Sequence, residues 1–392
     1  MYAKRIILRN FKSFAKTTVE LDRAFSSIVG PNGSGKCLRG DSRVLLSDGR
    51  LVSIRQLVDE ALLRDSHMLD DGVVSLSDGR VRVLSLNPKS LKMEEKPVSA
   101  FVRRQSPDTL YEIATKSGRR VVATSYHPVL TVRDGDVVAV NADQLKAGTW
   151  VALPRALPLE GTPFSPFSTF LGRQLDVYVK DDGALVSRLR SLKGARGLTW
   201  KKLASDAGVS FVALRGLLDG QAILLDAAHG LARFAGYFDH EFSRFNRVKA
   251  KNQSIYSTIP LEMTPDLARF LGLVLSEGRL VRNEVFFSNN DSVLLDDFCG
   301  LSLRLFGVRP TVCRSGPNTF AVLPSRPVAL LLEHVFGMAC FGGSAQKTVP
   351  ASILSSSRGV VAAFISGLFD GDGFVSDPCG KKAVLEYVSK SR

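Results

Sequence analysis

At residues 30–44 the chain reads GPNGSGKCLRGDSRV, and the character of the sequence changes within this stretch. Residues 30–36 follow an apolar run and form a glycine-rich loop of the kind that connects a strand to a helix and binds phosphates. The residue after Lys36 should be a Ser or Thr that holds Mg²⁺, but it is Cys37. The stretch therefore predicts one protein that is interrupted by another, with the junction between Lys36 and Cys37.

Composition places the chain among multidomain globular proteins. Its 392 residues are 45% hydrophobic and 23% charged, which allows several buried cores. No apolar run is long enough to cross a membrane and no signal-peptide pattern is present, so we expect no membrane partner. The five cysteines include no CxxC pair, which favours a reducing, cytoplasmic location. The formal net charge of +14 makes a polyanion the first partner to consider.

The first 36 residues predict the beginning of a nucleotide-binding domain. Short β-prone runs at residues 6–8 and 18–21 flank NFKSF at residues 10–14, and a third run at residues 26–29 enters the loop. FKSF followed by GPNGSGK at this spacing resembles the start of a structural maintenance of chromosomes (SMC) ATPase. The resemblance assigns the binding of ATP phosphates to Gly30, Asn32, Gly33, Ser34, Gly35 and Lys36. Because 36 residues cannot supply the rest of an ATPase, we interpret residues 1–36 as a β-strand and phosphate-loop stub of a host protein.

Residues 37–154 predict an all-β domain that begins with a nucleophile. Short β-prone runs alternate with the turn signals SDG at residues 47–49, LSDG at 76–79 and RDG at 133–135. Near neutral pH a Cys thiolate is the best nucleophile to attack the carbonyl of the preceding residue, and a His is suited to protonate the leaving amide nitrogen.

CLRGDS at residues 37–42 resembles the beginning of an intein, a self-splicing insertion, and TSYHP at residues 124–128 matches the Thr-x-x-His block of that family. The resemblance implies the horseshoe-shaped all-β fold that inteins share with Hedgehog autoprocessing domains. It also implies an N-to-S acyl shift at Cys37, with His127 as the acid, Thr124 positioning the scissile amide and Asp41 as a supporting polar residue. A buried Cys and a loop His without catalytic roles are the alternatives.

Cys37 also decides what we expect of ATP. A thiol is too soft a ligand for Mg²⁺, and the chain after Cys37 continues into β-prone runs instead of the helix that the loop requires. We therefore expect ATP binding only in the spliced host protein, where Lys36 is joined to a Ser or Thr.

Residues 155–260 form a basic insert in which WKKLASDAGVSFVALRGLL at residues 200–218 predicts two helices joined at Gly208, with Ser210 capping the second. The inward positions are Leu203, Ala204, Leu214 and Leu217. This pattern resembles a repressor-type helix-turn-helix, whose second helix enters the major groove. The expected DNA-contacting residues are Lys201, Lys202, Phe211 and Arg215, with Val212 on the same exposed side. A generic helical hairpin is the alternative.

Residues 261–392 contain two similar segments about 95 residues apart, FLGLVLSEG at residues 270–278 and ISGLFDGDG at residues 365–373. Each predicts an apolar helix with a small residue near its middle, an acid at its C-terminal end and a terminating Gly. Gly272 and Gly367 would let the two helices approach closely and bring Glu277 and Asp372 together. Two adjacent carboxylates bind hard cations such as Mg²⁺, which activates water for phosphodiester hydrolysis.

The two segments resemble the LAGLIDADG motifs of homing endonucleases, and SAQKTVP at residues 344–350 resembles the lysine block between them. The resemblance implies an α+β endonuclease domain in which Glu277 and Asp372 bind Mg²⁺ and Lys347 stabilises charge. It also implies a double-stranded DNA target in the host gene that lacks the insertion. Leu275, where the second segment has Asp370, departs from the motif.

The sequence as a whole predicts a multidomain α+β protein that splices itself and cuts DNA. Inteins end in His-Asn followed by Ser, Thr or Cys, and the printed sequence contains no such pair. We therefore expect a C-terminal intein and host segment as its partner, with the printed sequence being either a fragment of a longer gene product or one part of a protein whose remainder is encoded separately. Two other interpretations are an SMC-type ATPase with an inert passenger, and a non-enzymatic DNA-binding protein.

Overall fold

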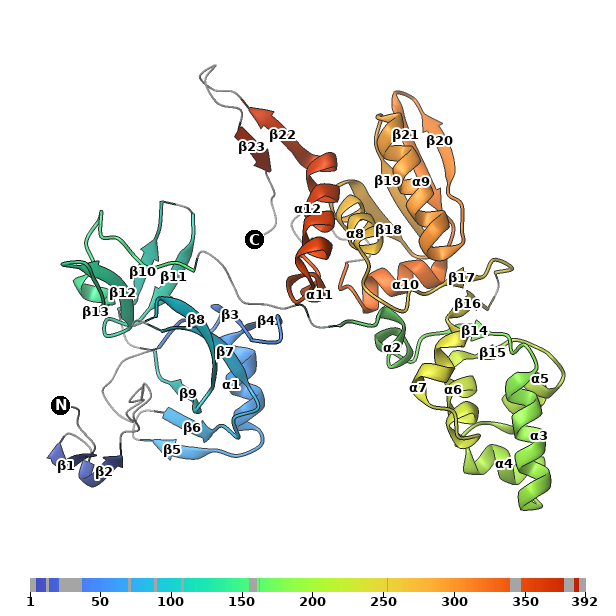
Figure 1. Ribbon diagram of the computed structural model, residues 1–392, viewed down its shortest axis with the longest axis horizontal. Coiled ribbons are helices and arrows are strands. Elements are labelled where there is room, and N and C mark those ends of the chain that lie inside the picture. Colours follow the sequence, from blue (N-terminus) through green and yellow to red (C-terminus); the bar gives the residue numbers. More distant parts are fainter. Residues whose placement is uncertain are drawn as a thin grey trace. The chain divides into compact units, whose positions relative to one another are not determined.

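The computed structural model describes residues 5–11, 14–20, 37–69, 72–87, 90–106, 109–116, 118–154, 161, 163–251, 253–338, 347–376 and 384–387. It divides the chain into two compact units, Met1–Leu159 and Glu160–Arg392 (Figure 1). Among the described residues, no helix combines the length and the apolar character required to span a membrane.

Short antiparallel strands build the first unit (Figure 1). They are β1 (Arg5–Phe11), β2 (Phe14–Glu20), β3 (Arg43–Leu45), β4 (Leu51–Ser53), β5 (His67–Leu69), β6 (Gly72–Leu76), β7 (Arg82–Asn87), β8 (Lys92–Pro97), β9 (Ala100–Arg104), β10 (Tyr111–Ala114), β11 (Arg120–Ala123), β12 (Pro128–Arg133) and β13 (Asp136–Asn141). All but β5, β6 and β9, which form a three-stranded sheet, pair as two-stranded hairpins. The strands predicted at residues 6–8 and 18–21 are confirmed as β1 and β2, whereas the one predicted at residues 26–29 lies outside the described residues.

The predicted turns are also present. Between β12 and β13, Asp134 and Gly135 both have positive φ angles, 53° and 88°, so Arg133 pairs directly with Asp136. A two-residue turn of this kind matches the right-handed twist of its flanking strands. The RDG signal at residues 133–135 is therefore confirmed as a hairpin turn.

The prediction of a purely β domain is wrong at two places. Helix α1 (Ile54–Leu62) follows β4, and the 3₁₀ turn η1 (Ala142–Gln144) follows β13. The hydroxyl of Ser53 accepts a hydrogen bond from the N–H of Gln56 and caps α1, and Val58 is buried below it. Residues 54–62 form a helix because their apolar side chains recur at helical spacing, even though the segments on both sides form strands.

The insert contains more than the helices that the sequence predicted. Its helices are α2 (Pro166–Leu171), α3 (Ala184–Arg196), α4 (Trp200–Asp206), α5 (Phe211–Leu218), α6 (Leu225–Phe234) and α7 (Asp239–Phe242), with the 3₁₀ turn η2 (Ser243–Phe245). Its strands are β14 (Val177–Val179), β15 (Ile223–Leu224), β16 (Arg247–Ala250) and β17 (Ser257–Thr258). The description of this insert as helical is therefore incomplete, because the four strands form a sheet in the order β15-β14-β16-β17. Each strand is too short to show an alternating pattern in the sequence.

The predicted helical pair is confirmed as α4 and α5. The hydroxyl of Ser210 accepts a hydrogen bond from the N–H of Ala213 at 3.2 Å, and Gly208 has a φ of 68° in the turn. The four inward positions are buried as expected: Leu203, Ala204, Leu214 and Leu217.

The remainder of the second unit is an antiparallel sheet with helices on one face (Figure 1). The helices are α8 (Pro265–Glu277), α9 (Ser292–Phe306), α10 (Arg326–His334), α11 (Ala351–Leu354) and α12 (Arg358–Asp372). The sheet has the order β18-β19-β21-β20, from β18 (Gly278–Val281), β19 (Glu284–Ser288), β20 (Thr311–Ser315) and β21 (Asn318–Leu323), and a separate hairpin pairs β22 (Gly373–Ser376) with β23 (Val384–Tyr387).

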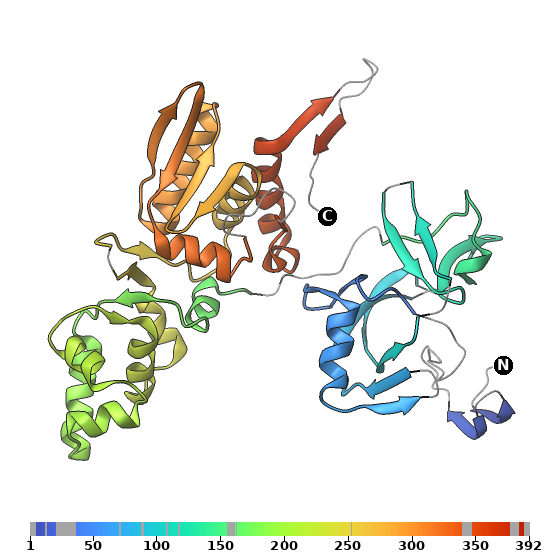
Figure 2. The same ribbon diagram turned by 180° about the vertical axis from the view of Figure 1, so that it is seen from behind.

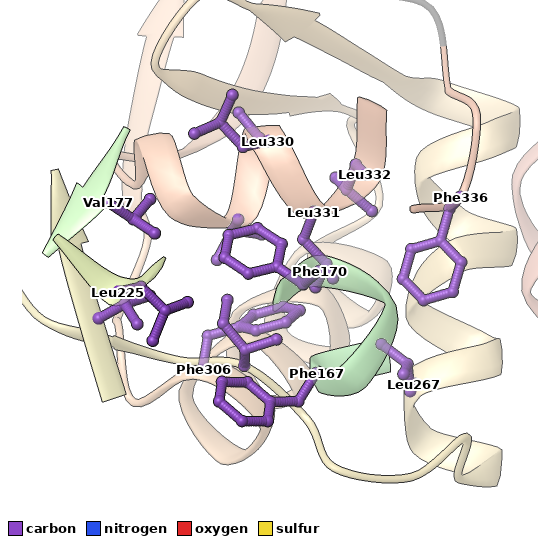
Figure 3. Close-up of a cluster of buried hydrophobic side chains, with 14 of the residues drawn as sticks. Phe167, Phe170, Val177, Leu225, Leu267, Phe306, Leu330, Leu331, Leu332 and Phe336 are labelled. Carbon is purple, nitrogen blue, oxygen red and sulfur yellow. The ribbon is translucent and has the colours of Figure 1, made fainter. Parts of the chain in front are cut away.

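A continuous apolar core joins the insert to this sheet-and-helix part. Phe167 and Phe170 of α2 lie among Leu331 of α10 and Phe306 of α9 (Figure 3). Leu225 of the insert lies in the same cluster (Figure 3). The predicted segments 155–260 and 261–392 therefore share one core, and their common boundary stays a prediction.

Helices α8 and α12 pack side by side in both views (Figures 1 and 2). A Cβ atom at Gly272 would lie 2.3 Å from the carbonyl oxygen of Phe364, and one at Gly367 would lie 2.4 Å from that of Arg269. Both distances are far below van der Waals contact. The prediction that Gly272 and Gly367 permit a close helix approach is confirmed.

Candidate functional site

The segment that begins with Cys37 lies along the end of β11. The N–H of Thr124 donates a hydrogen bond to the carbonyl oxygen of Cys37 at 3.0 Å, and the N–H of Arg39 donates to that of Val122 at 2.9 Å. Leu38 forms an antiparallel bridge with Ala123. Backbone pairing therefore fixes the residues that follow the Lys36–Cys37 peptide bond.

The side chain of Thr124 reaches that peptide bond. Its buried hydroxyl accepts a hydrogen bond from the N–H of Cys37 at 3.1 Å and lies 3.3 Å from the carbonyl oxygen of the same residue, to which it can donate. The nitrogen in the first contact belongs to the Lys36–Cys37 amide. The structure thus brings Cys37 and Thr124 together across 87 residues of sequence.

A tight turn carries the chain from Thr124 to His127. The N–H of His127 donates to the carbonyl oxygen of Thr124 at 3.0 Å, and the N–H of Ala142 donates to the carbonyl oxygen of His127 at 2.9 Å. The turn is thus fastened to η1, and its part-buried His127 belongs to the same turn as the Thr124 hydroxyl. An imidazole is a side chain that can donate a proton to a leaving amide nitrogen.

A cavity of about 690 Å³ opens beside Cys37 and Thr124. Its apolar wall includes Val58 of α1 and Val102 of β9. Asp41 accepts a bidentate hydrogen bond from the guanidinium of Arg39, which holds the pKa of its carboxyl below the ordinary value. Asp41, which the sequence suggested as a support for the junction, is therefore paired with Arg39 on the exposed surface.

The residues expected to bind ATP phosphates cannot be placed in the fold. Gly30, Asn32, Gly33, Ser34, Gly35 and Lys36 all lie outside the described residues. Their role stays a prediction from the sequence.

The second candidate site is formed by the C-terminal ends of α8 and α12. Glu277 is the last residue of α8 and Asp372 the last of α12. A Cβ atom at Gly371 would lie 3.1 Å from Cγ of Glu277, so the glutamate side chain rests against the end of α12. Burial, followed by the charge of Asp372, raises the pKa of Glu277, while Lys347 opposes this shift. Two carboxylates that repel each other in a partly buried place are suited to a shared cation.

The glycines that follow these helices serve a different purpose from the one predicted. Gly278 and Gly373 have extended backbones with φ angles of −87° and −81°, not the left-handed conformation of a typical terminating glycine. A Cβ atom at Gly278 would lie 2.4 Å from the carbonyl oxygen of Val274, and one at Gly373 would lie 2.5 Å from that of Phe369. Glycine is required because each strand leaves its helix in contact with the last turn.

Lys347 lies at the carboxylate pair, as the sequence predicted. Its ammonium donates a hydrogen bond to the carbonyl oxygen of Ser276 at 2.6 Å. Burial lowers the pKa of Lys347, while Asp372 and then Glu277 raise it. The three charged groups therefore interact within one small region.

Tyr387 is a member of the site that the sequence reasoning missed. Its hydroxyl is hydrogen-bonded to Asp372, and burial together with this carboxylate raises the pKa of the phenol. Tyr387 pairs with Gly373 in the β22–β23 hairpin, as Phe287 pairs with Gly278 in β18–β19. A comparison of the two repeats could have found it, but the hairpin loops differ in length, so simple spacing does not align the two residues.

Arg269 explains why Asp372, and not Asp370, faces Glu277. The Arg269 guanidinium lies 2.7 Å from a carboxylate oxygen of Asp297 on α9 and 2.8 Å from one of Asp370 on α12. Asp370 is thereby held in an ion pair between helices. Its counterpart on α8, Leu275, is buried.

The predicted DNA-contacting residues lie on α4 and α5. Lys201 is exposed, and Lys202 is paired with Asp206 at 2.8 Å. Phe211 is partly exposed and Arg215 lies 3.8 Å from Asp219. Val212 is 80% exposed, so an apolar side chain projects from the second helix.

The donor set of the carboxylate pair fits a hard divalent cation. Within the described residues no group of three or more His, Cys, Asp and Glu side chains forms a metal cage. Glu277 and Asp372 would hold Mg²⁺ through their carboxylate oxygens, the ligand type that this cation prefers. Such an ion would supply charge stabilisation for phosphodiester hydrolysis.

Comparison with known proteins gives a family and several partial relatives. The family model described as "Intein splicing domain" matches residues 44–384. The DNA polymerase of Thermococcus kodakarensis is 29% identical over 386 residues, covering 84% of this chain and 23% of the polymerase. The glutamine–fructose-6-phosphate aminotransferase of Methanocaldococcus jannaschii is 20% identical over 359 residues, covering 90% of this chain and 30% of that enzyme. The chain thus spans less than a third of the length of these curated relatives.

Solved structures are similar to a part of the chain. The crystal structure of the PabCDC21-1 intein is 24% identical, with a TM-score of 0.30, and covers 31% of this chain and 74% of that chain. The crystal structure of the TvoVMA intein is 20% identical, with a TM-score of 0.28. It covers 30% of this chain and 70% of the TvoVMA intein chain.

Proposed function

The chain belongs to the intein splicing domain family, and from this premise we propose that its protein splicing begins at Cys37. The Cys37 thiolate attacks the carbonyl carbon of Lys36. The C–N bond between Lys36 and Cys37 breaks, a thioester forms, and the amide nitrogen leaves as the amine of Cys37. His127 supplies the proton that this nitrogen takes up, and Thr124 holds the nitrogen in position.

The observation that carries this proposal is the hydrogen bond from the Cys37 N–H to the Thr124 hydroxyl. It joins the proposed positioning residue to the atom that must leave. Holding the nitrogen of the scissile amide in place before the reaction should increase the rate of the acyl shift.

The test uses the chain together with the C-terminal intein segment supplied in trans. Thiol reagents should release residues 1–36, as measured by mass spectrometry. Cys37→Ala should abolish the release and His127→Ala should slow it severely, while Cys313→Ala should leave it unchanged. Equal release by the Cys37→Ala protein would refute the thioester.

We propose a second activity, site-specific cleavage of double-stranded DNA by a LAGLIDADG-type homing endonuclease. Its support is the meeting of Glu277, Asp372 and Lys347 at the ends of two helices whose backbones approach closely at Gly272 and Gly367. Mg²⁺ bound there would activate water, and Lys347 would offset negative charge that develops on the phosphate.

The sheet beside α8 offers a surface for DNA. Buried side chains face the helices, and the alternate positions on β18, β19 and β21 include Arg279, Phe286 and Phe320. The Arg279 guanidinium lies 5.3 Å above the ring of Phe286. Helices α4 and α5 would add contacts through Lys201, Lys202, Phe211 and Arg215.

The cleavage test uses duplex DNA that carries the host gene joined across the codons for Lys36 and the residue after the insertion. The wild-type protein should cut it only with Mg²⁺, as measured by gel electrophoresis. Glu277→Gln and Asp372→Asn should bind the DNA without cutting it, whereas Asp370→Asn should retain more cleavage because Asp370 faces Arg269. Cutting at the wild-type rate by either of the first two variants would refute the metal site.

We infer that the host is an SMC-type ATPase and that the chain itself binds no ATP. The support is the FKSF and GPNGSGK pattern of residues 11–36 together with Cys37 in the position of the Mg²⁺ ligand. The matched relatives bear unrelated enzyme names, as expected of an insertion found in different hosts. Calorimetry with ATP and Mg²⁺ tests this inference. Micromolar binding by the wild-type chain that disappears in Lys36→Ala would refute it.

A further inference from the structure

Between Asp182 and Asp206 the chain contains no acidic residue. This acid-free run forms helix α3 and most of α4 (Figure 1). The run carries six cations: Arg188, Arg190, Lys193, Arg196, Lys201 and Lys202. It is therefore a concentration of positive charge within a unit that also holds the proposed endonuclease.

Four of these cations form what we call the basic stripe, namely Arg190, Lys193, Arg196 and Lys201. Within the part of the chain that the structure describes, none of the four makes an ion pair. Arg188 and Lys202 are not included because they pair with Glu241 and Asp206.

Several exposed arginines of the first unit differ from the stripe in having acidic partners. Six of them make ion pairs with neighbouring acids: Arg39, Arg50, Arg80, Arg82, Arg103 and Arg120. These six arginines therefore have local counter-ions, whereas among the described residues the four cations of the stripe do not.

The stripe includes residues of two helices, which are in contact through Lys193 and Trp200. Arg190, Lys193 and Arg196 follow one another at three-residue steps on α3, which makes them neighbours on its surface. The Lys193 ammonium lies 5.5 Å from the centre of the Trp200 ring, and Trp200 immediately precedes Lys201 at the start of α4. Aromatic rings therefore support these cations without neutralising their charge, since the Arg196 guanidinium also lies 5.8 Å from the Phe234 ring.

Helix stability does not account for the whole stripe. Cations near a helix C-terminus interact favourably with the helix dipole, which explains Lys193 and Arg196 at the end of α3. Lys201 lies in the first turn of α4, where a cation is unfavourable and where no acid is present. A position that works against the helix indicates that the charge serves an external anion.

We propose that the basic stripe binds the phosphate backbone of duplex DNA beside the α4–α5 helical pair. In helix-turn-helix proteins the first helix crosses the DNA backbone while the second enters the major groove. The stripe extends from the beginning of α4, the first helix of the pair, onto α3 and lengthens this backbone contact. The inference rests on the proposed function in that duplex DNA is the partner, and it concerns binding, not cleavage.

The test measures binding of the full chain to a labelled DNA duplex by fluorescence anisotropy, in EDTA and over a range of salt concentrations. Each phosphate contact contributes about −0.9 to the slope of log K against log salt. The stripe variant carries four substitutions: Arg190→Gln, Lys193→Gln, Arg196→Gln and Lys201→Gln. Its slope should be smaller in magnitude than the wild-type slope by about 3 to 4.

A matched control removes the same amount of charge from the other unit. The variant Arg50→Gln, Arg80→Gln, Arg82→Gln and Arg120→Gln should keep the wild-type slope, because its arginines are ion-paired. A second control exchanges Arg and Lys within the stripe and should also keep most of the slope, which separates loss of charge from loss of folding.

Each outcome bears on a different claim. The proposal that the stripe binds DNA would be overturned if the variant with all four stripe substitutions kept the wild-type salt slope. It would also be overturned if the matched control lost as much of the slope as the stripe variant. No binding of duplex DNA by the wild-type protein would overturn the stripe and the DNA partner together. Binding with the expected slopes but no cleavage in Mg²⁺ would leave the stripe in place and overturn the endonuclease alone.

Discussion

Around Cys37 the protein uses backbone hydrogen bonds to position the groups proposed to react, whereas around Glu277 and Asp372, the proposed metal site, it uses two close-packed helices. The first unit has few buried side chains near its site, such as Val58 and Ala123, and relies on the pairing of Leu38 with β11. In α8, by contrast, nine of thirteen residues are buried, and they hold Glu277 at the end of a rigid element.

The comparison shows what each chemistry requires. An acyl shift needs one peptide bond held against one hydroxyl, and a paired backbone with a single side-chain contact does this. A shared cation needs two carboxylates from distant segments at a fixed separation, which requires a dense interface. Substitutions at the first site should therefore act mainly on the reaction rate, whereas substitutions within the helix interface that supports the second site should act mainly on stability.

The largest expected effect comes from Gly272→Ala. The new Cβ would lie 2.3 Å from a backbone carbonyl oxygen of α12, so the helices must separate. We expect a loss of roughly 2–3 kcal/mol in the free energy of unfolding of the second unit, the upper range for overpacking. Urea denaturation measures it, and thiol-induced release of residues 1–36 should not change.

Gly359→Ala is the matched control for this substitution. Gly359 lies in the same helix pair, but no atom lies within 4 Å of the position of its added Cβ. We expect it to be neutral or slightly stabilising, since Ala favours helix over Gly. Equal losses in the two variants would show that helix contact is not what makes Gly272 necessary.

Thr124→Val should slow thiol-induced cleavage at Cys37 about tenfold, which corresponds to one hydrogen bond of about 1.4 kcal/mol lost from the transition state. The valine has nearly the same shape, so the thermal unfolding of the first unit should change little. Thr124→Ser retains the hydroxyl and should stay close to the wild-type rate. A normal rate for the valine variant would remove Thr124 from the mechanism.

Tyr387→Phe tests whether the second site includes its hydroxyl. Terbium(III), a hard cation with luminescence excited by nearby tyrosine, serves as the probe for the carboxylate pair. The variant should lose most of the sensitised emission and bind terbium about fivefold more weakly, because the hydrogen bond that orients Asp372 is gone. Tyr256→Phe is the control, and equal emission from wild type and Tyr387→Phe would place the ion elsewhere.

On stability, Glu277→Gln should produce the smallest effect, a rise of a few degrees in the melting temperature at pH 8. Burial and Asp372 raise the pKa of Glu277, so the folded protein holds its proton more tightly than the unfolded chain. The stability from this group is fully present below the unfolded-state pKa and is lost as the pH rises through the folded-state pKa. Glutamine cannot ionise, so the increase in melting temperature should vanish near pH 4. Calorimetric scans at pH 4 and pH 8 would measure this difference.

Local patterns in the sequence determined the elements that carry the two candidate sites. The RDG turn, the Ser210 cap and the acid at the end of each repeat depend on a few consecutive residues, and each is found where it was predicted. The close approach at Gly272 and Gly367 also followed from the sequence, because the two repeats share one pattern. The strands of the insert were missed because each is too short to show an alternating pattern. Helix α1 was missed because β-prone runs surround it, although its own apolar residues have helical spacing.

Only the tertiary structure decided which of these groups touch. The Thr124 hydroxyl reaches the Cys37 nitrogen across 87 residues, and the Lys347 ammonium reaches the carbonyl oxygen of Ser276 across 71. The presence of Tyr387 beside Asp372, and the diversion of Asp370 to Arg269, likewise depend on strand register and helix rotation. Sequence specifies the chemistry that a side chain can perform, but contacts between distant segments are fixed by packing, since a rotation of one helix exchanges every neighbour on its surface.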